Sequence, residues 1–112
     1  MIEQILLEYL QENIDIPVYL EIPENVDTTE FIIFEKTSSS CSNYLNSSTI
    51  AIQSYADSMY RAAEINYEIK NIMVNFNSLD EISSCKLNSD YNFTDTKKRI
   101  YRYQAVFDIV HY

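Results

Sequence analysis

The last segment of the chain, residues 99–112, reads Arg-Ile-Tyr-Arg-Tyr-Gln-Ala-Val-Phe-Asp-Ile-Val-His-Tyr. On one face an extended strand would carry Tyr101, Tyr103, Ala105, Phe107 and Ile109. On the other face it would carry Arg102, Gln104, Val106, Asp108 and Val110. This period-two spacing, rich in aromatic and β-branched residues, is typical of a strand packed on at least one side. Because residues 105–110 are apolar on both faces except at Asp108, we expect a long inner strand of a sheet.

The composition is that of an ordinary globular protein. The chain has 112 residues, of which 46% are hydrophobic and 22% are charged, and this length suits one domain with a modest core. Apolar runs are short, so no membrane-spanning helix is expected. Residues 1–4 lack the basic region of a signal peptide, so we expect the chain to stay in the cytoplasm where it is made. In that reducing compartment, Cys41 and Cys85 are expected to be free thiols.

The net charge of −9 is distributed unevenly. Residues 1–35 hold nine acids and no Lys or Arg, whereas residues 36–112 hold eight acids and eight bases. Half of the bases form a cluster in the sequence: Lys97, Lys98, Arg99 and Arg102. Because phosphate contact needs positive potential, so acidic a chain is a poor general ligand for nucleic acid. The acidic end and the basic cluster either meet between identical subunits or are both solvated surface.

Two helices are predicted from the apolar spacing. Ile2, Ile5, Leu6, Tyr9 and Leu10 form one helical stripe, so a first helix should end near Asn13, ahead of Pro17. A second helix should be capped by Asp57 or Ser58 and should run to about Asn75. Its predicted buried face consists of Met59, Ala62, Ala63, Ile65, Ile69, Ile72, Met73 and Phe76.

Strands are predicted at 16–22, 31–36, 49–55 and 82–88, ahead of the final strand, with a polar connection over 23–30. The element order is then α-β-β-β-α-β-β. Such an order predicts an α+β fold with a mainly antiparallel sheet and both helices packed on one face. The opposite face of the sheet must be covered or must accept solvent, and a half-exposed face would carry Tyr-rich strands.

Residues 37–48 read Thr-Ser-Ser-Ser-Cys-Ser-Asn-Tyr-Leu-Asn-Ser-Ser and show no periodicity. We predict a long flexible loop between two strands of the single domain 1–112. It is either an idle connection or a segment that orders on a partner, with Tyr44 and Leu45 as anchors. We favour the second interpretation, because loops of this length in small domains are often functional.

No residue pattern predicts catalysis, a cofactor or a metal. His111 is the only histidine, and neither Ser nor Cys has a nucleophile motif beside it. One His and two separated Cys do not have the spacing of a zinc site. The chain has no Gly, whereas phosphate loops and dinucleotide fingerprints need glycines for backbone approach. Asp90 and Asp95 are interpreted as solubilising acids and not as a catalytic pair, so we expect a protein that is not an enzyme.

Ten tyrosines are an unusual number for this length. Tyr9, Tyr55 and Tyr60 are expected to pack in the core or on the sheet. Tyrosine is also enriched in protein interfaces, and the residues at or beside predicted loops are the candidates for contact: Tyr44, Tyr91, Tyr101 and Tyr103.

Six blocks of sequence carry a family resemblance. They are Ile-Pro-Val-Tyr-Leu-Glu-Ile-Pro-Glu at 16–24, Phe-Ile-Ile-Phe-Glu-Lys-Thr at 31–37, Ile-Ala-Ile-Gln-Ser-Tyr-Ala at 50–56, Ala-Ala-Glu at 62–64, Ser-Asp-Tyr-Asn-Phe-Thr-Asp at 89–95 and Tyr-Arg-Tyr-Gln-Ala-Val-Phe-Asp-Ile at 101–109. Together they resemble the small tail terminator, or tail completion, proteins of tailed bacteriophages, and the last block is the most distinctive. The family usually places glycines after the Glu-Lys-Thr step, where this chain has Ser38, Ser39 and Ser40.

The resemblance implies a non-enzymatic structural protein with an α+β fold. Such proteins form a hexameric ring on the end of the finished tail tube, where the ring stops tube growth and offers a surface to the head connector. The implied partners are other copies of the chain, the tail tube protein, the head–tail connector or stopper, and the sheath protein if the tail is contractile. The implied location is the tail or neck of the virion, after synthesis in the bacterial host cytoplasm.

A closed ring with head-to-tail contacts needs two complementary patches on each subunit. The acidic residues 1–35 and the basic cluster are the candidates for these patches. The residues expected at subunit or tube contacts are Tyr44, Leu45, Tyr91, Lys97, Lys98, Tyr101, Arg102 and Tyr103. One alternative is another neck component, such as a head–tail stopper. Another is an acidic nucleic-acid mimic that inhibits a DNA-binding enzyme, although mimics spread carboxylates along the fold and here the excess is confined to residues 1–35.

Overall fold

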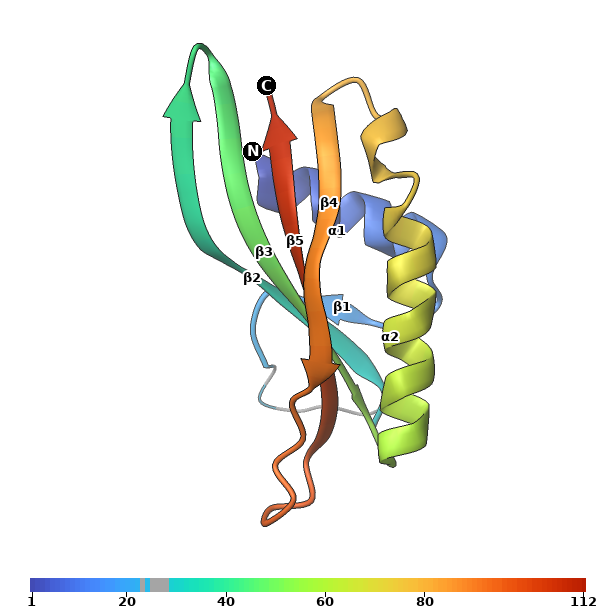
Figure 1. The fold of residues 1–112 in the computed structure, drawn as a ribbon. Helices are drawn as coiled ribbons and strands as arrows, with labels where there is room; N and C mark the ends of the chain where they lie inside the picture. Colours follow the sequence, from blue (N-terminus) through green and yellow to red (C-terminus); the bar gives the residue numbers. More distant parts are fainter. Residues whose placement is uncertain (23, 25–28) are drawn as a thin grey trace.

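The structure is a computed structural model that describes residues 1–22, 24 and 29–112. These residues form two α-helices, one short 3-10 helix and a five-stranded sheet (Figure 1). The elements are α1 (Ile2–Asn13), β1 (Val18–Tyr19), β2 (Phe31–Ser42), β3 (Leu45–Ala56), α2 (Met59–Met73), η1 (Phe76–Ser78), β4 (Ile82–Asn92) and β5 (Tyr101–His111). The α+β class and the order α-β-β-β-α-β-β are therefore confirmed. Neither α-helix of the described residues is long and apolar enough to cross a bilayer.

The strands lie in the order β1-β2-β3-β5-β4. Only β1 runs parallel to its neighbour, and the pairs β2–β3, β3–β5 and β5–β4 are antiparallel. β5 pairs with β3 along its whole length, from Tyr101 opposite Ala56 to His111 opposite Asn46. With β4 on its other side, β5 is the inner strand that its sequence predicted.

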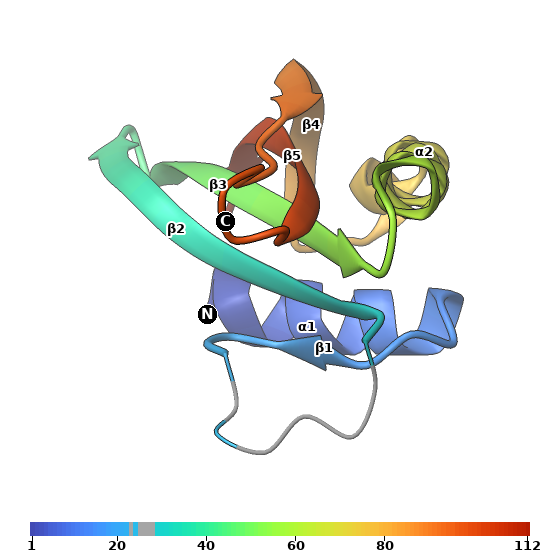
Figure 2. The same ribbon diagram turned by 90° about the horizontal axis from the view of Figure 1, so that it is seen from below.

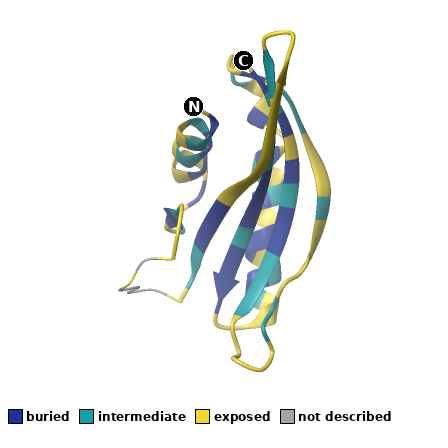
Figure 3. Cartoon of the chain, turned by 90° about the vertical axis from the view of Figure 1, so that its left-hand side faces the viewer, coloured by how far each residue is buried: buried dark blue, intermediate teal, exposed yellow. Residues whose placement is uncertain are grey.

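Both helices pack on one face of the sheet, where their buried side chains and those of the strands form a single core. Figure 2, which looks along the strands, shows α1 along one part of this side and α2 along another. Figure 3 shows the buried residues on the strands and on both helices. The core includes Ile2, Leu6 and Leu10 of α1, Ala62, Ile65, Ile69 and Met73 of α2, Ile32 and Phe34 of β2, Ile50 and Ile52 of β3, and Ala105, Phe107 and Ile109 of β5.

The ends of α2 agree with its sequence, but its buried face differs from the predicted one at Met59 and at Asn66. The side chain of Ser58 accepts a hydrogen bond from the Arg61 amide at 3.1 Å, which caps the helix. Met59, predicted to be buried, is exposed at the first position of the helix, where its sulfur accepts a hydrogen bond from Asn92 Nδ2 at 3.2 Å. Asn66 is buried in the middle of the helix instead.

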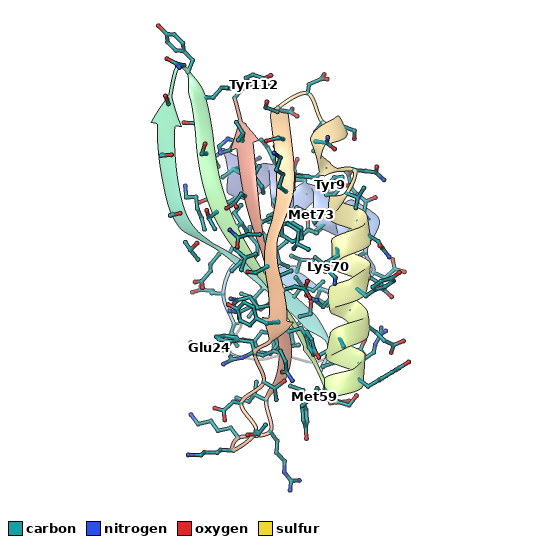
Figure 4. All side chains as sticks on the ribbon, viewed as in Figure 1. Tyr9, Glu24, Met59, Lys70, Met73 and Tyr112 are labelled. Carbon is teal, nitrogen blue, oxygen red and sulfur yellow. The ribbon has the colours of Figure 1, made fainter. Side chains whose placement is uncertain are left out.

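Tyr9 connects the two helices at the far end of α2. Its hydroxyl donates to the carbonyl oxygen of Ile72 at 2.6 Å, and its ring meets the ring of Phe76 edge-on at 5.0 Å. Figure 4 labels Tyr9 close to Met73, the last residue of α2. The core role predicted for Tyr9 agrees with this position. An edge-on aromatic pair adds roughly 0.5–1.5 kcal/mol beyond the apolar area that it buries.

The prediction of a flexible loop at 37–48 is wrong, because these residues complete a β-hairpin. β2 continues to Ser42, β3 begins at Leu45, and only Asn43 and Tyr44 form the turn. Both turn residues have positive φ angles, 52° and 66°, as in the type I′ turns that join hairpin strands. Most of the residues in this part of the hairpin are exposed, so no core imposed an apolar alternation on them.

The strand predicted at 16–22 is reduced to Val18–Tyr19, which pairs with Ile32 and Ile33. Leu20 and Ile22, which would share a face with Val18 in a full strand, are exposed because the chain leaves the sheet after Tyr19. The polar connection predicted over 23–30 lies partly outside the described residues.

Candidate functional site

The face of the sheet opposite the helices, called the open face here, carries a row of rings across four strands. Phe31 stacks on Tyr55 with ring centroids 4.6 Å apart, and Tyr19 lies 6.4 Å from Phe31. The guanidinium of Arg102 lies 5.7 Å from the ring centroid of Tyr55 and 4.4 Å from that of Phe93. Tyr91 lies edge-on to Phe93 at 6.1 Å. We call the set Tyr19, Phe31, Tyr55, Arg102, Phe93 and Tyr91 the aromatic row.

A chain of hydrogen bonds holds the aromatic row in place. The hydroxyl of Tyr55 accepts from Arg102 Nη1 at 3.1 Å and donates to Gln53 Oε1 at 3.0 Å. Gln53 Nε2 donates to Gln104 Oε1 at 2.8 Å, and Gln104 Nε2 donates to the hydroxyl of Tyr91. Side chains already fixed by such bonds lose little conformational entropy when a partner covers them. The row is therefore preorganised for contact.

Three of the clustered bases lie at the end of the β4–β5 hairpin, called the basic tip here. Lys97, Lys98 and Arg99 are all exposed, and the turn is closed by the amide of Lys98, which donates to Asp95 Oδ1 at 3.2 Å. The structure separates Arg102 from these three, because its Nε donates to the carbonyl oxygen of Phe93 at 2.8 Å on the open face. The four bases therefore lie in two separate places: three at the basic tip and Arg102 on the open face.

The β2–β3 hairpin ends at the opposite end of the molecule from the basic tip (Figure 1). The molecule measures 45 × 25 × 24 Å, and its two hairpin ends differ in chemistry. Residues 37–49 contain no charged side chain. Tyr44 at the turn is 96% exposed and holds a positive φ angle that few residues other than Gly adopt easily.

The predicted contact residues fall into four places. Tyr44 and Leu45 lie together at the turn of the β2–β3 hairpin, and Lys97 and Lys98 lie at the basic tip. Tyr91 and Arg102 meet on the open face. Tyr101 and Tyr103 share the helix-covered side with Ala105, and Tyr103 packs against the core.

Sequence reasoning missed several residues of the open face: Tyr19, Phe31, Phe93, Gln53 and Gln104. Tyr55 packs on the sheet as predicted and is buried within the aromatic row, whereas Tyr60, also predicted to pack, is 76% exposed on α2. What brings these residues together is the register of neighbouring strands, which places Phe31 opposite Tyr55 and Tyr55 opposite Arg102. Register is set by tertiary pairing and cannot be obtained from one strand alone.

Ser48 and His111 place a hydroxyl next to an imidazole, the two groups of a nucleophile–base pair. Ser48 Oγ and His111 Nε2 lie 2.9 Å apart, but the two residues are only 4% and 8% exposed. Burial lowers the pKa of His111, and the positive charges of Lys36 and the Met1 amino group lower it further. Both side chains of the pair are therefore almost completely enclosed by the protein.

The remaining reactive groups do not converge. Among the described residues, no three or more His, Cys, Asp or Glu side chains are grouped to hold a metal ion. Cys41 is an exposed free thiol, and Cys85 is a half-buried one whose pKa is raised to about 11 by burial. The open face, the basic tip and the Tyr44 turn are therefore the candidate sites.

No protein-family model and no curated protein sequence matches this chain. The resemblance to tail terminators therefore depends on the sequence blocks alone. The most distinctive block, 101–109, forms most of the inner strand β5, and the blocks at 31–37 and 50–56 fall in β2 and β3.

Proposed function

We propose that this chain is a structural protein of a phage particle, a tail terminator. Copies of it assemble into a hexameric ring on the end of the tail tube, stop tube growth and offer the docking surface for the head connector. The proposal is supported by the sequence resemblance and by the agreement between the α+β fold that the resemblance implies and the observed one. Its place would be the tail or neck of the virion.

The observation that carries most weight is the open face with its aromatic row. Aromatic side chains with polar ends are enriched where proteins meet, because they bury a large area and still satisfy their hydrogen bonds. Tyr91 and Phe93 remain exposed, while Tyr55 and Gln104 beneath them are buried and fixed. An apolar, hydrogen-bonded surface of this kind suits binding to another protein and needs no reacting group.

Opposite charges at separate places suit contacts between identical copies. Glu8 and Glu12 on α1, followed by Asp15, are exposed, whereas the basic tip lies at one end of the molecule. Head-to-tail contacts between unlike patches generate rings when the rotation closes. Three other bases already form ion pairs within the chain: Lys36 with Glu3, Arg61 with Glu30 and Lys70 with Asp90.

A tube-growth assay tests the proposal. Purified tail tube protein is polymerised with and without this chain, and tube lengths and ends are measured by electron microscopy. We expect shorter tubes with a ring density at one end. Tubes of unchanged length with bare ends would refute the proposal, and a variant with unfolded structure, such as Leu6→Asp, serves as the inactive control because Leu6 is completely buried.

A further inference from the structure

The sheet has two free edges that differ in how well they are protected against pairing. β1 covers β2 only at Ile32 and Ile33, so the edge of β2 from Phe34 to Ser42 has no strand neighbour among the described residues. β4 forms the other edge along its whole length. An unpaired edge presents backbone donors and acceptors that another strand can bind.

The outer part of β2 lacks the features that usually prevent such pairing. Natural edge strands carry charged residues, prolines or bulges that block another strand. Residues 38–42 read Ser-Ser-Ser-Cys-Ser, without charge or proline, and their pairing with β3 is regular. β4 carries two charged residues, Lys86 and Asp90, and two register shifts, so it is only partly protected. The edge of β2 is therefore available for a partner strand.

The strand register places a segment of the β2 edge and a segment of the β4 edge at the same position along the strand direction. Ser38 aligns through Thr49 and Asp108 with Lys86, and Cys41 aligns through Asn46 and His111 with Ile82. Residues 38–41 and 82–86 therefore lie level with each other on opposite edges of one sheet. A neighbour turned about an axis parallel to the strands brings one segment to the other.

The directions of β2 and β4 allow the two edges to pair in the antiparallel orientation. Each step from β2 to β3, β5 and β4 is antiparallel, so β2 and β4 run in opposite directions. A rotation about an axis along the strands does not reverse them. The β4 edge of a neighbour would meet the β2 edge as an antiparallel pair, which is the more stable ladder.

We propose that residues 38–42 of one subunit pair with residues 82–86 of a second copy, so that the sheet continues from subunit to subunit. The contact joins two unlike edges and can repeat until a ring closes. This inference rests on the proposed ring and assigns the contact between neighbouring subunits of that ring to these two strand segments. The aromatic row and the Tyr44 turn then remain free for the tube and the connector.

Cysteine crosslinking between differently tagged copies tests the contact. In a background with Cys41→Ser and Cys85→Ser, one protein carries Ser39→Cys in β2 and the other carries Ser83→Cys in β4; both positions are exposed. The two proteins are mixed with tube protein and treated with a short bismaleimide. We expect mixed dimers, and we expect none when Glu68→Cys on the exposed side of α2 replaces Ser83→Cys.

The outcomes separate this inference from the proposed function. Crosslinks between the β2 strands of two copies would indicate a twofold dimer instead of the proposed head-to-tail contact, and they would overturn the inference. A ring of correct mass and normal tube capping, without mixed crosslinks, would overturn the inference and leave the proposed function standing. Absence of both ring and capping in the wild-type chain would overturn both.

A backbone variant gives an independent test. In a two-residue hairpin the residues that flank the turn, here Ser42 and Leu45, exchange hydrogen bonds, so the amide of Ser39 should point away from β3. Ser39→Pro removes that outward donor and should abolish assembly while the circular dichroism spectrum is kept; Ser39→Thr should assemble normally. Assembly by Ser39→Pro at the wild-type concentration would overturn the inference, and if this variant does not fold, the crosslinks decide alone.

Discussion

Replacing Tyr44 by Gly should make the protein more stable and a poorer binder. Tyr44 holds a φ angle of 66° in the β2–β3 turn, a conformation that costs a residue with a Cβ about 1–2 kcal/mol. Gly removes this cost but loses roughly 0.5–1 kcal/mol more backbone entropy on folding. Since the side chain is 96% exposed, its removal sacrifices almost no burial. The net gain in unfolding free energy should be about 0.5–1 kcal/mol.

Urea unfolding measures this gain as a higher midpoint with an unchanged slope, and thermal unfolding should show a rise of about 2–6 °C. Tyr44→Ala is the matched control, because it removes the ring but keeps the backbone strain, and its stability should stay close to that of the wild type. Both variants should cap tubes less well. Equal stability of the Gly and Ala variants would refute the strain argument, and normal capping by both would remove Tyr44 from the contact surface.

Three further predictions concern charge, thiols and pH. Reversing all three bases of the basic tip to Glu should prevent ring formation as judged by light scattering, whereas Lys97→Arg with Lys98→Arg should not; intact rings after reversal would exclude the tip from subunit contacts. At pH 7.5 a thiol reagent should modify Cys41 quickly and Cys85 slowly, because burial raises the pKa of Cys85 to about 11; two equal rates would contradict the burial. The lowered pKa of His111 makes the neutral ring favourable to folding, so stability should be full above about pH 6.5 and should fall as the pH drops through the folded-state pKa. His111→Gln should flatten this decline measured by urea unfolding, and an unchanged pH slope would show that another group controls it.

The helices and β5 could be predicted because each has one face in the core. Burial imposes a period of 3.6 on α1 and α2 and a period of two on Tyr101–His111, and these periods are visible in the sequence. The outer β2–β3 hairpin has little of its surface in the core, so Ser and Thr suffice and no period arises. Its turn also uses Asn43 and Tyr44 where Gly is the usual signal.

The candidate site was only partly predictable for a related reason. The alternation in β5 already placed Arg102 on one face of the strand and Tyr101 and Tyr103 on the other. It did not indicate which of these two faces the helices cover. The aromatic row gathers one or two residues from each of several strands that are distant in the sequence. Only the observed register places Tyr55 between Phe31 and Arg102.

The solution mass of the chain, measured by light scattering with and without tube protein, tests the central claim that copies of this protein act by assembling with one another. We expect a closed species of about six copies when tube ends are present. A chain that stays monomeric at every concentration and leaves tube ends bare would contradict it.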